Sequence, residues 1–202
     1  MIRIKQIAAL ALGLIAFCFA GSIFAAVALP IGWYVEADGG YSGVSNTSFG
    51  SGTTNSNNGF AFGGDVGYKF MPYLAGEIGY IRYANITAKS SKGQFAKQVL
   101  QEFDIAAKGI LPISDTGLEL FAKLGATRLN SHITITNAAA ATVVGNPPAL
   151  GTKNVIGFFM GLGAAYSFLP NVQGLIQWSQ AKGNTNTGNA NFFSVGLAYI
   201  IS

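Results

Sequence analysis

Eight segments between residues 32 and 201 alternate in residue character with a period of two. In GWYVEADGGYS, Trp33, Val35 and Tyr41 fall on one face and Glu36 and Asp38 on the other, because successive side chains of a β-strand point to opposite faces. No stretch from residue 32 onward has the roughly 18 apolar residues that a membrane helix needs. The chain is therefore predicted to be all-β, with strands near residues 32–42, 60–70, 74–80, 102–111, 118–125, 160–168, 172–179 and 193–201.

The second face of these segments differs from the surface of a soluble β-sandwich, which carries many Lys, Glu and Thr side chains. Here Gly, Ala and Ser dominate, and charged residues make up only 10% of the chain, against about 25% in soluble domains. This face is typical of a confined interior, while the apolar face meets lipid. Because an open sheet in lipid leaves edge groups unpaired, the strands must close. The sequence predicts an eight-stranded antiparallel up-and-down transmembrane β-barrel.

The connections between the segments alternate in length. Short turns with proline are expected at residues 71–73, 112–117 and 169–171, since proline cannot donate to a strand ladder. Longer polar connections are expected near residues 43–58, 84–97, 131–153 and 183–190. This asymmetry is typical of periplasmic turns and extracellular loops, and it predicts that both chain ends lie on the periplasmic side.

The N-terminal region is typical of a secretory signal peptide. Arg3 and Lys5 precede an apolar run at residues 7–19, and small residues follow it. Cleavage is expected after Ala20, Ala26 or Ala28. We therefore expect a signal peptide at residues 1–28 and a barrel domain at residues 29–202. Lipidation of Cys18 is not expected, because the preceding Phe17 is bulky.

Composition excludes several function classes. Without residues 1–28 the chain has ten basic and eight acidic residues, a net charge of +2 that is too small to indicate nucleic-acid binding. It then has no cysteine, and His132 is its one histidine, so no metal site, cofactor or thiol chemistry is predicted. Its glycine-rich runs alternate with aromatic residues and do not open a helix, so no nucleotide site is predicted either.

Three stretches carry a family resemblance: GFAFGGDVGYKFMPYLAGEIGY, FDIAAKGILPISDTGLELFAKLGA and FFMGLGAAYSFLPNVQGLIQW. Together with NFFSVGLAYII they resemble the N-terminal transmembrane barrel of outer-membrane protein A, over residues 32–201. The resemblance implies a location in the Gram-negative outer membrane, surrounded by lipid and lipopolysaccharide, and assembly by the barrel assembly machinery. It also implies inward positions for Glu77, Lys108 and Lys123. No peptidoglycan-binding domain is expected after the barrel.

The predicted interior is rich in charged side chains. Eight strands leave an interior just wide enough for side chains to fill, and an unpaired buried charge costs several kcal/mol. We therefore expect the inward charges to pair into a plug, although the absence of any acidic residue after Glu119 makes the arrangement lopsided. The residues of this predicted network are Glu36, Asp38, Asp65, Lys69, Glu77, Asp104, Lys108, Glu119 and Lys123.

The predicted loops offer candidate interaction surfaces. Lys89, Lys92 and Lys97 in the second loop would contact lipopolysaccharide phosphates, or would simply be solvated. The apolar stretch AAAATVVGNPPALG in the third loop would pack on itself over the barrel mouth, or would bind a host or surface ligand. The first loop is rich in Ser, Thr, Asn and Gly and is expected to be flexible.

The primary functional prediction is a non-enzymatic outer-membrane barrel that supports envelope integrity and acts through its extracellular loops. One alternative is a narrow pore, because Gly161, Gly163 and Ala165 leave one inner wall thinly filled. A lipid A-modifying enzyme is the other alternative. It lacks support because alternation points His132 outward and no carboxylate follows it in the sequence.

Overall fold

The computed structural model describes residues 30–45, 49, 53–113, 116–138, 144, 151–184 and 187–201. Most of them lie in ten antiparallel strands that form one sheet. The predicted signal peptide, residues 46–48 and 50–52 of the first predicted loop, and residues 139–143 and 145–150 of the third lie outside these residues. The strands are β1 (Gly32–Ser45), β2 (Thr54–Ser56), β3 (Asn58–Met71), β4 (Leu74–Arg82), β5 (Ile86–Ser90), β6 (Gly93–Ile113), β7 (Leu118–Ile135), β8 (Gly151–Leu169), β9 (Val172–Ala181) and β10 (Asn189–Ile201).

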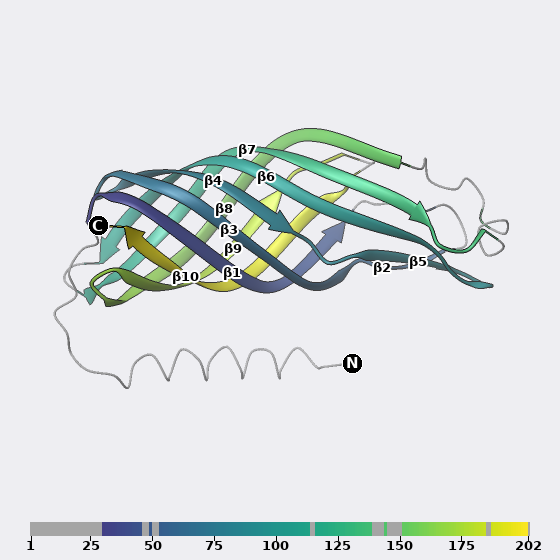
Figure 1. Cartoon of the computed structure of the whole chain (residues 1–202), viewed down its shortest axis with the longest axis horizontal. Coiled ribbons are helices and arrows are strands. Elements are labelled where there is room, and N and C mark those ends of the chain that lie inside the picture. The colour runs from purple at the N-terminus through teal and green to yellow at the C-terminus, as the bar shows by residue number, and fades with distance from the viewer. Residues whose placement is uncertain are drawn as a thin grey trace.

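Eight of these strands close into a ring, and Figure 1 shows the barrel from the side. The order around the ring is β1, β3, β4, β6, β7, β8, β9 and β10, and β1 pairs with β10 over its whole length to complete it. Closure gives the backbone groups of each ring strand partners on both sides, which lipid could not supply. The predicted eight-stranded antiparallel barrel is confirmed.

The barrel has two different ends. The short β3–β4, β6–β7 and β8–β9 connections lie at the end where β1 begins and β10 finishes, which we call the turn end. The opposite end, on the right in Figure 1, carries β2, β5 and the longer connections, and we call it the loop end.

The structure corrects the predicted extent of two loops. The connection expected at residues 84–97 consists mostly of strand, because β5 and the start of β6 lie within it, and the connection expected at residues 131–153 is entered by β7, which continues to Ile135, and by β8, which begins at Gly151. The pairing β5–β6 includes Thr87 opposite Lys97, and β6–β7 continues to Ala96 opposite Ile135. Alternation of apolar outward residues stops at the end of the lipid-facing zone, whereas backbone pairing continues past it. The predicted strand ends therefore coincide with the end of the lipid-facing zone, and the hydrogen-bonded strands extend beyond it.

The outward face carries an apolar belt. Phe60, Ile78 and Leu124 are among the exposed large hydrophobic residues on it. Trp33 contacts Tyr68 with ring centroids 5.1 Å apart near the turn end, and Tyr80 contacts Phe103 at 5.0 Å farther along the wall. Aromatic girdles of this kind flank the lipid-facing band of membrane barrels. Among the described residues, no helix has the length and apolar character needed to cross a bilayer.

Candidate functional site: the barrel interior and the loop end

Two buried lysines hold the centre of the interior. Lys123 Nζ lies 2.8 Å from Glu77 Oε2 and 3.3 Å from both Glu36 Oε1 and Asp65 Oδ2. Lys108 Nζ lies 2.8 Å from Glu77 Oε1 and 3.3 Å from Glu36 Oε2. Each lysine thus bridges carboxylates from different strands. Removing one partner of such a buried ion pair destabilises the fold, because it leaves an uncompensated charge in a low-dielectric environment.

A second ion pair lies nearer the turn end. Lys69 Nζ is 3.0 Å from Glu119 Oε1, and both side chains are buried. Gln173 on β9 donates to the other carboxylate oxygen of Glu119 at 3.0 Å. Both oxygens of this buried carboxylate therefore have a donor.

Neutral polar side chains on β9 and β10, two strands without acidic residues, donate hydrogen bonds to the carboxylates of the interior. Gln177 Nε2 on β9 donates to Asp38 Oδ2 at 2.7 Å and to Glu36 Oε1 at 3.1 Å. Ser194 Oγ on β10 donates to the same Asp38 oxygen at 2.5 Å. The lopsided distribution of charge is thus compensated by amide and hydroxyl donors.

The interior holds more carboxylates than lysines. Asp65 and Asp104 both point toward Gly79, where any Cβ atom would overlap them. Glu102, on the same inward face of β6 as Asp104, accepts a hydrogen bond from Tyr83. Asp104 Oδ1 and Glu102 Oε1 have no hydrogen-bond partner among the described residues. Among the described residues three lysines are buried, Lys69, Lys108 and Lys123, whereas seven carboxylates point inward: Glu36, Asp38, Asp65, Glu77, Glu102, Asp104 and Glu119.

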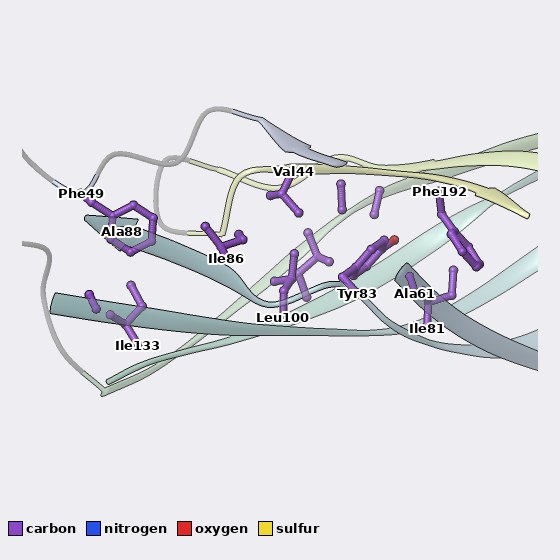
Figure 2. Packing of buried hydrophobic residues seen from close by; sticks show 14 of the residues in the cluster. Val44, Phe49, Ala61, Ile81, Tyr83, Ile86, Ala88, Leu100, Ile133 and Phe192 are labelled. Carbon is purple, nitrogen blue, oxygen red and sulfur yellow. The ribbon is translucent and has the colours of Figure 1, made fainter. Parts of the chain in front are cut away.

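Clusters of buried apolar side chains lie on both sides of this charged layer. A turn-end cluster includes Tyr34, Ile110 and Phe121. The larger loop-end cluster extends along the barrel axis, and Figure 2 shows its side chains between the strands, including Leu100, Tyr83 and Phe192. A cavity at the turn end has a volume of about 20 Å³, which is room for about one water molecule. The charged layer thus lies between two apolar layers.

This filling leads to a prediction on the pore alternative. The protein without residues 1–28, inserted into a planar bilayer, is expected to give no stable conductance steps, because buried apolar side chains occupy the interior on both sides of the charged layer. An eight-stranded barrel has no spare width around such side chains. Reproducible steps at a fixed voltage would contradict this expectation and support the pore.

All nine predicted network residues lie on the inward face, eight of them buried and Asp65 partly exposed. The structure connects Lys108, Lys123, Glu36, Glu77 and Asp65 in one cluster, and Lys69 with Glu119 in another. Sequence reasoning missed the donors Tyr34, Gln173, Gln177 and Ser194. For the residues on β9 and β10, the alternation in the sequence already indicated that the side chains point inward. They were missed because only charged residues were considered for the interior network.

The three predicted loop lysines lie on a β-hairpin at the loop end. Lys89 and Lys92 are exposed, and Lys97 is partly exposed. Four further basic side chains lie at this end or at the boundary of the apolar belt, and none of the seven has an ion-pair partner among the described residues. These four are Arg82, Arg128, Lys153 and Lys182.

His132 lies on the outer face of β7, where it is exposed. Its Nδ1 atom is 3.0 Å from Thr152 Oγ1 on β8, and its β6 neighbour in the ladder is Val99. Among the described residues no carboxylate is hydrogen-bonded to this ring, so the third group that orients the base in a catalytic triad is not present beside it. Among the described residues no group of three or more His, Cys, Asp or Glu side chains is arranged to hold a metal ion.

Comparison with known proteins decides the family. The model of the outer membrane protein beta-barrel domain family matches residues 9–200. The chain belongs to this family. As a member it resides in the outer membrane, among lipid and lipopolysaccharide. The turn end then faces the periplasm and the loop end is extracellular, as in other outer-membrane barrels.

Solved structures show the same fold at low identity. Neisserial surface protein A has a TM-score of 0.56 and 19% identity, over 84% of this chain and 97% of that one. OprG from Pseudomonas aeruginosa has a TM-score of 0.60 and 11% identity, over 86% and 97%. Ail, the attachment invasion locus protein of Yersinia pestis, has a TM-score of 0.52 and 12% identity, over 85% and 100%. No curated protein gives a significant match.

Proposed function

We propose that the protein is a non-enzymatic surface barrel that binds anionic groups of lipopolysaccharide through its extracellular end and so contributes to envelope integrity. The observation that carries this proposal is the separation of charge. Every acidic residue in the described part of the chain is turned into the barrel, whereas seven basic side chains lie at or near the extracellular end. Phosphate-rich lipopolysaccharide is the natural counterpart of a cationic surface without acidic neighbours.

The proposal also covers soluble polyanions, which offer a direct assay. The similar barrel Ail has been crystallised with the heparin analogue sucrose octasulfate. This compound presents dense negative charge without acyl chains, so it probes the exposed hairpin independently of the membrane. Binding of a host or surface ligand at the extracellular end would use the same charges.

The test is to replace Lys89, Lys92 and Lys97 together with glutamine. Each exposed charge pair is worth about 0.2–1 kcal/mol, so the triple variant should bind sucrose octasulfate about tenfold more weakly at low salt. Calorimetry on detergent-refolded protein would measure this loss, and retention of lipopolysaccharide during purification would be compared in parallel.

The matched control is Ser91→Gln, which changes an exposed residue of the same hairpin and leaves its charge intact. The control should bind as the unmodified protein does, and added salt should weaken both. Equal binding and equal lipopolysaccharide retention by the triple variant would disprove a role for these lysines.

A further inference from the structure

Two arginines lie at the upper boundary of the apolar belt, on the outer wall of the barrel. Arg82 ends β4, two residues beyond Tyr80 on the same face, and Arg128 follows Leu124 and Ala126 on the outward face of β7. Arg82 is partly exposed and Arg128 is exposed. Neither has an ion-pair partner among the described residues.

The strand register brings the two arginines onto one patch. Arg82 pairs with Gln101 on β6, while Arg128 pairs with Phe103, two residues away on the same face of that strand. From strand spacing and rise, their Cα atoms are about 12 Å apart. Two arginine side chains can therefore contact one ligand that spans the intervening β6.

The neighbours of the patch are apolar on the membrane side. Arg128 lies between Phe103, which is 53% exposed, and Ile156, which is 81% exposed. Arg82 faces Phe62 across the β3–β4 ladder. Beyond the arginines the outer face becomes polar, where Asn130 donates to Asn154 at 2.8 Å. The patch thus marks the level at which acyl chains give way to headgroups.

We infer that Arg82 and Arg128 form a binding site for the phosphorylated headgroup of lipid A in the outer leaflet. An arginine forms paired, charge-assisted hydrogen bonds with phosphate, and the adjacent Phe103 and Ile156 contact the acyl chains of the same molecule. A soluble anion would gain nothing from these apolar neighbours, so the mixed chemistry selects a lipid. This inference rests on the proposed lipopolysaccharide binding and adds a second contact to it: the wall binds the lipid A headgroup, and the Lys89–Lys92–Lys97 hairpin binds anionic groups farther from the membrane.

The experiment counts lipid A molecules bound to the detergent-refolded mature protein by native mass spectrometry. The probes are lipid A with both phosphates and the same lipid after removal of its phosphates. The variant Arg82→Gln/Arg128→Gln should bind the phosphorylated lipid at least about tenfold more weakly, because charge-assisted hydrogen bonds at two residues are lost. The unmodified protein should prefer the phosphorylated lipid by a similar factor.

Two controls separate this site from the hairpin. Lys89→Gln/Lys92→Gln should bind phosphorylated lipid A normally and sucrose octasulfate weakly, whereas the double-arginine variant should show the reverse. Heat-modifiable gel migration, unchanged in all variants, would show that each barrel is folded. Normal lipid A binding by the double-arginine variant, or equal binding of both lipids, overturns the inference even if the hairpin lysines bind the polyanion. If neither probe binds the unmodified protein, the proposed function itself fails.

Discussion

Replacing Lys123 with methionine is expected to lower the free energy of unfolding by about 3–5 kcal/mol, the usual cost of leaving buried charges without their partner. Methionine preserves most of the side-chain volume but removes the ammonium group that lies within 3.3 Å of Glu36, Asp65 and Glu77. Lys108 would remain beside Glu36 and Glu77, but Asp65 would lose its ion-pair partner. Urea unfolding in lipid vesicles would measure the change.

Asp104→Asn provides the matched control in the same interior. This carboxylate is buried, has an unpartnered Oδ1 atom and forms no ion pair among the described residues. Neutralising it should leave stability unchanged or increase it, because a buried charge without a partner is removed. Combining Lys123→Met with Asp65→Asn should cost less than the sum of the single changes. A Lys123→Met barrel as stable as the original would mean that these ion pairs contribute nothing to stability.

The second large effect is expected at Gly125, where alanine should lower the free energy of unfolding by about 3 kcal/mol, the upper part of the range for overpacking. Gly125 pairs with Ala106 on the inner side of the β6–β7 ladder. A Cβ atom there would overlap the carbonyl oxygen of Ile105 and lie 2.7 Å from the Ala106 Cα atom. Because the obstacle is backbone, the strands would have to separate.

Gly109→Ala is the control on the same ladder. Gly109 pairs with Ala122 on the lipid-facing side, where the nearest atom to an added Cβ is 4.0 Å away. This change should be neutral or slightly stabilising, since glycine weakens a strand. The two variants would be compared by urea unfolding and by boiling-dependent gel migration. Equal stability of the two would show that the inner wall relaxes without cost.

Prediction from sequence succeeded where a side chain's position follows from parity. Lys108 and Lys123 are flanked directly by small or apolar residues, so a strand turns both lysines inward when those adjacent residues face lipid. The same reasoning oriented His132 outward and Ser131 inward. It failed at the strand ends beyond the membrane, because residues 96–101 carry no apolar outward pattern and still pair with β7.

The sequence did not predict which interior side chains pair with one another. Lys69 pairs with Glu119, 50 residues away, although Asp65 is nearer in sequence and on the same face of β3. Gln177 donates to Asp38 from a strand 139 residues later. Such contacts depend on ring closure and on the stagger between strands, which bring distant side chains to the same level of the interior.

The sequence by itself determined the all-β class, the barrel and the two faces of each strand, because a period of two and a lipid solvent leave one closed arrangement for the backbone. Only the tertiary structure decided how the interior charges pair and where the buried apolar clusters lie along the barrel. Those properties depend on the register between strands, and register fixes which side chains share a level along the barrel axis.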